Sequence, residues 1–316
     1  MTEPGGIPDV SVVICTYNRV ADLLRVLDVL ERQTGLESVR WELVVVDNNS
    51  SDGTREAVGA RIAAGRLPLR YLFEPVQGKA HALNRAIRET AAPILAFTDD
   101  DVLLTDHWLS ALVAPFADPA CMGVGGAVTP VWLGERPAWA SESEPYRMMG
   151  AIVQYAQPVE GQRVTAPPIG ANSAWRREVF ERHGLFVEEL GHSGGRVIPG
   201  EDIEFGQRVM HRGETIIFSR RAEVGHPVTL ARLNRRYFEH WYFQRGRLEA
   251  FVAGYRPTHP TRIAGVPRYL LRELPSWGIK WLSARDPRGR FYFKLRAMMA
   301  AGAIREFYRR RNDRAA

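Results

Sequence analysis

The first hundred residues alternate short apolar runs with amphipathic segments. VSVVIC (10–15) is an apolar, β-branched run typical of a strand, and residues 21–34 carry leucine and valine at helical spacing before Gly35. The alternation then continues with a strand at 42–46, a helix from about Thr54, a strand at 69–75, a helix over 78–91 and a strand over 93–98. Such alternation predicts a mainly parallel sheet with helices on both faces.

Polar clusters follow three of these strands. TYNR comes after the first strand, DNNSSD after the second and DDD after the fourth. In open α/β sheets, ligands bind at the carboxyl ends of the strands. We therefore expect these clusters to form one site.

The pattern loosens after residue 122. MGVGGAV predicts a strand, and residues 130–168 are rich in Pro, Trp, Glu and Ser with little periodicity. Long loops of this kind are often functional, so we expect 130–168 and a second loop at 185–198 to set substrate specificity. Two further helices and a strand follow, and Arg-rich, aromatic-rich helical segments begin near residue 229. We expect a catalytic domain over 1–226 and a helical extension over 227–316.

Composition narrows the class of protein. The 316 residues are 45% hydrophobic and 25% charged, which excludes a disordered chain, a collagen-like chain and a coiled coil. No run approaches 18 apolar residues, and the first ten residues lack the features of a secretory signal. The chain has two cysteines, Cys15 and Cys121, which do not predict a disulfide framework. A reducing compartment is therefore expected, and the sequence predicts a cytoplasmic protein.

Charge is divided unevenly along the chain. The net charge is +6, but residues 226–316 hold 20 Lys and Arg against 6 Asp and Glu, and residues 1–225 hold 22 against 30. A basic tail on an acidic body indicates contact with a phosphate-rich surface such as anionic lipid or nucleic acid. A solvated helical face is the alternative.

Three adjacent carboxylates, Asp99, Asp100 and Asp101, follow a buried strand. They repel one another unless a cation neutralises them, and oxygen ligands suit Mg²⁺ or Mn²⁺. An N-cap for the following helix is the alternative interpretation. Asp47 and Asp52 could accept hydrogen bonds from a base or ribose, although an Asx turn or helix cap explains Asp52 equally well. The dinucleotide fingerprint and the P-loop are both absent from the sequence.

Six segments, in order, carry a resemblance to a known family: SVVICTYNR, VVVDNNSSDGT, GKAHALNRAI, FTDDD, IGANSAWRREVF and PGEDIEFGQRV. Together they span about residues 10–226 and resemble glycosyltransferase family 2, a group of metal-dependent, inverting sugar transferases. The resemblance implies a GT-A fold, in which helices flank a Rossmann-like, mainly parallel sheet, here with a basic helical C-terminal extension. It also implies Mg²⁺ or Mn²⁺ as cofactor and a nucleotide diphosphate sugar as donor, with a UDP-sugar as the first expectation. The role would be single-sugar transfer to an unidentified acceptor hydroxyl in glycan, glycolipid or glycoconjugate biosynthesis.

The resemblance also assigns roles to individual residues. Asp202 would be the catalytic base with Glu201 on the acceptor side, although a pair of acids at a helix start is also explained by the helix dipole. Because Thr98 occupies the first position of the Asp-rich motif, Asp100 is the preferred metal ligand, supported by Asp101 and by His226, for which a structural role is the alternative. The nucleotide would be bound by Thr16, Tyr17, Asn18, Arg19, Asp47, Lys79 and Asp99, and the donor sugar or acceptor would lie beside Gly170, Ala171 and Asn172. A surface position for Lys79 and a cap role for Asn172 are the alternatives.

The extension carries weaker signals. QRGRL (244–248) faintly resembles the QxxRW element of processive synthases, but Leu248 replaces the Trp, so single-sugar transfer is favoured. Residues 268–299 combine arginines with four aromatics, which predicts peripheral docking on an anionic membrane, with packing against the protein body as the alternative. The four aromatics are Trp277, Trp281, Phe291 and Tyr292. We expect no nucleic-acid partner.

Two other functions compete with sugar transfer. A nucleotidyltransferase would need a Gly-rich phosphate loop near the N-terminus, which CTYNRV does not provide. A non-catalytic, basic membrane-binding module would explain the extension but would leave the Asp99–Asp101 cluster and Asp202 without a role.

Overall fold

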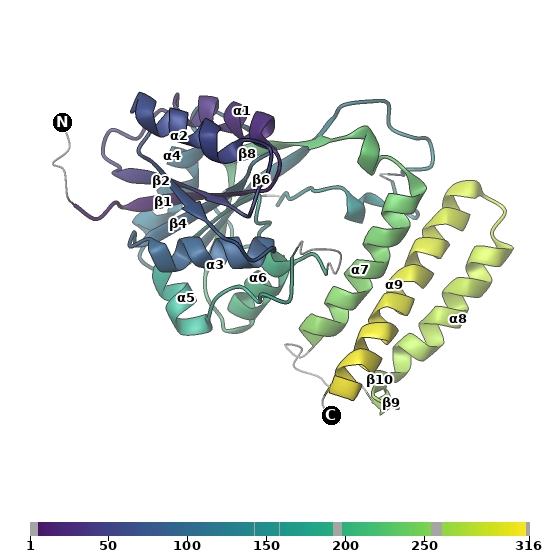
Figure 1. Cartoon of the computed structure of the whole chain (residues 1–316). Helices are drawn as coiled ribbons and strands as arrows, with labels where there is room; N and C mark the ends of the chain where they lie inside the picture. The colour runs from purple at the N-terminus through teal and green to yellow at the C-terminus, as the bar shows by residue number, and fades with distance from the viewer. Residues whose placement is uncertain (1–5, 142, 158, 192–197, 254–260, 314–316) are drawn as a thin grey trace. The chain divides into compact units, whose positions relative to one another are not determined.

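The computed structural model describes residues 6–141, 143–157, 159–191, 198–253 and 261–313. Residues 192–197 of the expected specificity loop lie outside the described residues. The chain divides into two compact units (Figure 1). The first contains Met1–Thr129, Tyr155–Arg196 and Glu201–Pro227, and the second contains Pro130–Gln154, Val197–Gly200 and Val228–Ala316.

An eight-stranded sheet in the order β3-β2-β1-β4-β7-β6-β8-β5 organises the first unit. Its parallel half consists of β1 (Val10–Thr16), β2 (Trp41–Asp47), β3 (Leu69–Phe73) and β4 (Ile94–Asp99). The mixed half consists of β7 (Asn172–Arg176), β6 (Gly123–Trp132), β8 (Ile216–Val228) and the short β5 (Leu103–Leu104). The apolar runs of β1 and β2 are buried on both faces, as a central parallel strand requires.

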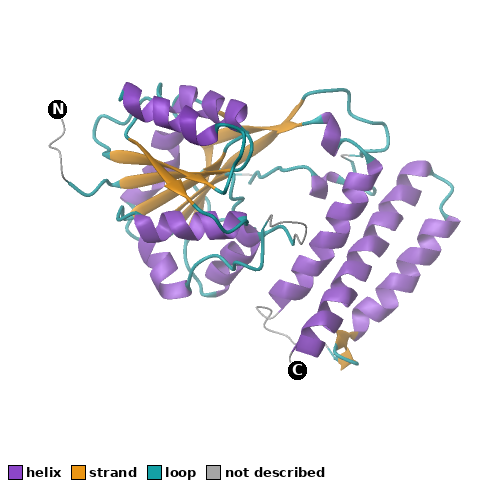
Figure 2. Cartoon of the chain, viewed as in Figure 1, coloured by secondary structure: helices purple, strands orange, loops and turns teal. Residues whose placement is uncertain are grey.

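Helices cover both faces of this sheet (Figure 2). One face carries α1 (Val20–Leu30), α2 (Thr54–Ala64) and α4 (Trp108–Val113), and the other carries α3 (Lys79–Glu89), α5 (Arg177–His183) and α6 (Glu201–His211) (Figure 1). The expected architecture, a mainly parallel α/β sheet flanked by helices, is therefore confirmed. Among the described residues of the expected loop at 130–168, the structure has the end of β6, a 3₁₀ turn at Met149–Ala151 and isolated β-bridges at Tyr155 and Arg163.

An aromatic cluster fixes the position of α6. The Phe205 ring stacks on Phe180, with centroids 4.6 Å apart, and meets the edge of Trp175 at 5.0 Å. All three side chains are almost fully buried. Because interiors are close-packed, α6 cannot shift without disturbing this cluster, and the acidic residues in its first turn are held accordingly.

Three helices make up most of the second unit: α7 (Arg235–Val252), α8 (Arg268–Ser283) and α9 (Pro287–Asp313), with β9 (Arg262–Ile263) and β10 (Val266–Pro267) forming a small hairpin before α8. Helix α9 lies between the other two (Figures 1 and 2). Glycines let α7 and α9 approach closely, because a Cβ at Gly246 would lie 1.8 Å from the Met299 carbonyl oxygen and one at Gly302 would lie 2.0 Å from that of Phe243. Among the described residues, no helix is both long enough and apolar enough to cross a bilayer.

The arginines of QRGRL stabilise this helical unit. Arg245 pairs with Glu249 at 2.9 Å, and Arg247 pairs with the buried Glu306 of α9 at 3.1 Å. The Arg247 pair therefore joins α7 to α9, whereas the Arg245 pair lies within α7.

The four aromatics of the extension pack within the helical unit. Phe291 is buried in a cluster with Phe238 and Leu295, and Tyr292 packs against the same cluster. Trp277 stacks on Phe293, with centroids 6.0 Å apart, and the Trp281 ring lies under the Lys294 ammonium. The expectation that these aromatics form a lipid-contacting face is therefore wrong, because intramolecular packing uses them.

Candidate active site

The acidic cluster begins at the carboxyl end of β4, beside the loop that follows β1. Asp100 is buried, and its carboxylate accepts hydrogen bonds from the Thr16 hydroxyl at 2.7 Å and from the Arg19 guanidinium at 3.1 Å. The same Arg19 nitrogen donates to Asp101 at 2.6 Å. Burial raises the pKa of Asp100 to about 6, and Arg19 and the Thr16 hydrogen bond oppose that rise. Asp100 therefore links the strand end to the first loop.

Asp99, Asp101 and the buried His226 form the group that could hold a cation. One potential ligand atom from each residue lies within 4.8 Å of the others. The sequence prediction was Asp100, Asp101 and His226. The structure brings Asp101 and His226 together with Asp99 instead, because Asp100 is directed inward to Thr16 and Arg19. Carboxylates suit Mg²⁺ and Mn²⁺ and imidazole is a common ligand of transition metals, so this mixed group could hold a divalent cation.

Lys79 connects this group to a second pair of carboxylates. Its ammonium, at the start of α3, donates to Asp99 at 2.5 Å and lies 4.0 Å from the Glu201 carboxylate. Although burial opposes ionisation of Asp99, the Lys79 charge and hydrogen bond outweigh it and lower the pKa of that carboxyl. Lys79 is thus partly buried between the two acidic groups and is not a free surface lysine.

Asp202 is the second acid of the α6 first turn. Its carboxylate accepts backbone hydrogen bonds from Gly170 and from Ile203, both at 2.7 Å. A Cβ on Gly170 would lie 3.3 Å from the Asp202 Cβ, so Gly170 lets this backbone pass close to the acid. Burial, followed by repulsion from the neighbouring Glu201, raises the pKa of Asp202 to about 6. A carboxylate with such a pKa is ionised at neutral pH and remains a competent proton acceptor.

The loop after β2 is held by hydrogen bonds within the protein. Asp47 is buried and accepts from the Tyr71 hydroxyl at 2.7 Å and from the Ser50 backbone at 2.8 Å. Asp52 accepts from the Val20 backbone at 2.9 Å and from the Thr54 hydroxyl at 2.6 Å, so it caps the start of α1. The sequence suggested a cap for the helix that begins near Thr54, but the N-cap of α2 is Gly53, without a side-chain hydrogen bond, and Asp52 instead bonds the first N–H of α1.

Asn48 is a residue that the sequence analysis missed. Its side chain donates to the carbonyls of Glu74 and Val76 and accepts from the Gly78 N–H at 2.8 Å. These bonds fix the turn that leads directly into Lys79. The signal was its position beside Asp47 in the DNN cluster.

Tyr17 and Asn18 lie in the loop after β1. Tyr17 is about half exposed, whereas Asn18 adopts a left-handed backbone conformation with φ of 51°. The Asn18 side chain accepts from the Ser51 N–H at 2.7 Å, so the loops after β1 and β2 are joined.

Ala171 and Asn172 are buried where β7 begins. The Ala171 carbonyl accepts from Thr98, and the Asn172 amide donates to the carbonyls of Ala127 and Ala222 and accepts from the Trp108 indole at 2.9 Å. Both N–H donors and the oxygen of the Asn172 amide are therefore engaged in hydrogen bonds within the protein. In the described part of the chain, Gly170 is the one residue of this segment that bonds a candidate catalytic group, through its N–H to Asp202.

We expect Asn172→Ala to lower the free energy of unfolding by about 3 kcal/mol, because it leaves an indole N–H and two carbonyls without their buried partner. Urea denaturation measures this change. Affinity of the folded variant for Mn²⁺ with a nucleoside diphosphate should remain unchanged. Lost affinity at unchanged stability would instead give Asn172 the donor-contacting role that the sequence predicted.

Comparisons with known proteins identify the family of this chain. Residues 11–184 match the family model described as glycosyl transferase family 2. Validoxylamine A glucosyltransferase of Streptomyces hygroscopicus subsp. jinggangensis is 43% identical over 117 residues, covering 36% of this chain and only 27% of that enzyme. Glycosyltransferase AglE of Haloferax volcanii is 28% identical over 222 residues, covering 70% of this chain and 67% of AglE.

The fold also matches a solved structure, the mannosyltransferase PcManGT from Pyrobaculum calidifontis in complex with GDP-Man and Mn²⁺. The TM-score is 0.62 at 20% identity, covering 97% of this chain and 89% of that one. The family match covers more than half of the chain. The chain therefore belongs to glycosyl transferase family 2 and has a GT-A fold.

Proposed function

We propose that this enzyme transfers a single sugar, with inversion, from a nucleotide diphosphate sugar to an acceptor hydroxyl, using a divalent metal. The observation that carries the proposal is the contact of Lys79 with both acidic groups. Its ammonium bonds Asp99 of the candidate cation group and approaches Glu201, the neighbour of Asp202. A donor-activating group and a proton acceptor are therefore linked through one cation.

The donor side consists of Asp99, Asp101 and His226 as ligands for Mn²⁺, together with Lys79 and Arg19. When bound, the metal would neutralise charge on the diphosphate leaving group. Solved structures of similar fold contain GDP-Man with Mn²⁺ or UDP with Mn²⁺, which supports a nucleotide-sugar donor. We retain a UDP-sugar as the first donor to test.

The acceptor side consists of Asp202 and Glu201. Inversion requires a carboxylate that takes the proton of the acceptor hydroxyl while that oxygen attacks the anomeric carbon. Asp202 is oriented for this task by the Gly170 and Ile203 N–H groups, each of which uses one of several lone pairs on the carboxylate. Glu201 keeps the pKa of Asp202 raised and is the second candidate for contact with the acceptor.

We expect Mn²⁺ and a nucleoside diphosphate together to raise the melting temperature by several degrees, because binding to the folded state stabilises it. Differential scanning fluorimetry with UDP, GDP and each metal measures this shift. Each component alone should have a smaller effect than the pair. The absence of any shift with the pairs would favour a non-catalytic binding module.

A donor screen identifies the reaction. Nucleotide sugars are incubated with Mn²⁺ or Mg²⁺, and the released nucleotide is quantified. Release of a nucleoside diphosphate supports sugar transfer. Release of pyrophosphate from a nucleoside triphosphate with a sugar phosphate would instead identify a nucleotidyltransferase.

A further inference from the structure

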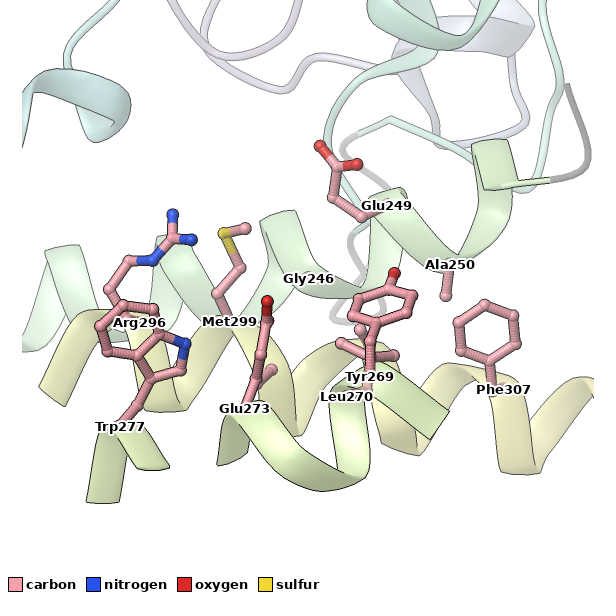
Figure 3. Close-up of a pocket in the computed structure, with 12 residues that line it drawn as sticks. Gly246, Glu249, Ala250, Tyr269, Leu270, Glu273, Trp277, Arg296, Met299 and Phe307 are labelled. Carbon is pink, nitrogen blue, oxygen red and sulfur yellow. The ribbon is translucent and has the colours of Figure 1, made fainter. Parts of the chain in front are cut away.

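Helix α8 packs by one face only. Its Leu270 is buried in a cluster with Ala300 and Ala303 of α9. Its Tyr269, Glu273 and Trp277 line a groove of about 180 Å³ over α9, and Figure 3 shows them on the same side of the helix. The opposite face of α8 must therefore be covered by water or by a partner.

Three apolar residues lie on that opposite face. Pro275, Ile279 and Leu282 occupy positions i, i+4 and i+7, so they share one side of the helix. All three are exposed, and the exposed fractions of Ile279 and Leu282 are 67% and 71%. Isolated exposed apolar residues are normal, but a line of them along one helix marks an interaction site.

Basic residues surround this apolar line. Two arginines lie on the same side of α8 as this line and three lie in the turn and first residues of α9, and all are exposed: Arg268, Arg272, Arg285, Arg288 and Arg290. The exposed Lys280 lies on the flank of α8, with its ammonium 4.5 Å from the centroid of the Trp277 ring. In the described part of the chain, none of the six pairs with a carboxylate. Asp286 is the one exposed acid between residues 268 and 290, and it accepts the Arg288 and Gly289 N–H groups at the start of α9. The surface is therefore strongly cationic.

We propose that the outer face of α8 docks on an anionic lipid surface. An amphipathic helix lying in the membrane plane buries apolar side chains at the headgroup boundary while basic side chains meet lipid phosphates. Ile279 and Leu282 would supply the apolar contact, and the five exposed arginines would meet the lipid phosphates. The predicted membrane contact is thus retained, but its residues differ from the four aromatics that the sequence suggested. The inference is independent of sugar transfer, since it rests on α8 and the start of α9 alone.

Sedimentation with lipid vesicles tests the proposal on the full chain. Binding is measured with phosphatidylcholine vesicles and with vesicles that also contain phosphatidylglycerol, at low and high ionic strength. We expect binding to require the anionic lipid and to weaken at high salt, because the attraction is screened within a Debye length. Each basic residue near the surface should contribute about fivefold, so Arg268→Gln with Arg272→Gln should weaken binding by more than tenfold.

A second variant tests the apolar part. Ile279→Gln with Leu282→Gln should also weaken binding by about tenfold or more, since glutamine keeps the helix and removes the apolar contact. Matched controls lie on the catalytic unit, where Ile62→Gln removes an exposed apolar residue and Arg25→Gln with Arg66→Gln removes two exposed charges. The controls should bind like the wild type, and every variant should hydrolyse donor at the wild-type rate in the absence of lipid.

Three results would overturn the proposal: no wild-type binding at low salt, equal binding to neutral vesicles, or unchanged binding by both α8 variants. Light scattering tests the other possible occupant of this face, which is a second copy of the chain. If the wild type is a dimer that Ile279→Gln with Leu282→Gln converts to monomer, the face binds a second copy of the chain and not lipid.

Discussion

Replacing Asp202 by asparagine should reduce turnover by two orders of magnitude or more and leave donor affinity within about twofold. The amide keeps the size of the side chain and its oxygen can still accept one backbone hydrogen bond, from Gly170 or Ile203. It cannot accept the proton of the acceptor hydroxyl. Single-turnover rates with a saturating acceptor measure the loss, and calorimetry measures donor affinity.

The pH profile separates a catalytic role from a structural one. The pKa of Asp202 is raised to about 6, so the base is protonated below that pH and ionised above it. The wild-type kcat/KM should therefore fall tenfold per pH unit below about 6, and this acid limb should disappear in Asp202→Asn.

Glu201→Gln provides the matched control. It removes the adjacent negative charge, so the acid limb should move to lower pH while most turnover is retained. If Asp202→Asn keeps its rate and Glu201→Gln loses it, the base is Glu201.

The fold could be predicted because its signals are local. The β-branched runs of β1, β2 and β4 alternate with helical periodicity, and period alone distinguishes these elements. The polar clusters after these strands could be assigned to one site because carboxyl ends of parallel strands share an edge. The prediction for the four aromatics failed because amphipathic composition does not reveal which side of a helix meets its neighbour. In α8 that side carries Trp277, and the outer side carries Ile279.

The roles of individual site residues could not be predicted, because they depend on contacts between segments that are far apart in the sequence. Asp100 could not be distinguished from Asp99 or Asp101 by sequence, since the difference lies in the Thr16 and Arg19 side chains, more than 80 residues away. Asn172 resembled a site residue because its motif adjoins Gly170, yet its amide bonds to segments 45 and 50 residues away. A short motif therefore indicates where a site lies, but it does not show which of its side chains contacts the ligand.

The carboxylates at the end of β4 should respond differently to neutralisation. We expect Asp101→Asn to weaken Mn²⁺-dependent binding of the nucleoside diphosphate by about 100-fold or more, since it removes one of two carboxylates from the candidate cation group. Asp100→Asn should weaken it by less than about tenfold, because the amide oxygen can still accept from Thr16 or Arg19 and Asp100 is not a member of that group. Calorimetry with Mn²⁺ and UDP or GDP, whichever binds the wild type, measures both affinities, and thermal denaturation shows whether each variant is folded. We expect His226→Gln to weaken this binding about as much as Asp101→Asn does.

If Asp100→Asn loses metal-dependent binding while Asp101→Asn retains it, the metal ligand is Asp100, as the sequence motif alone had suggested. Equal losses in the two folded variants would mean that the whole turn, held together by Arg19, binds the cation as one unit.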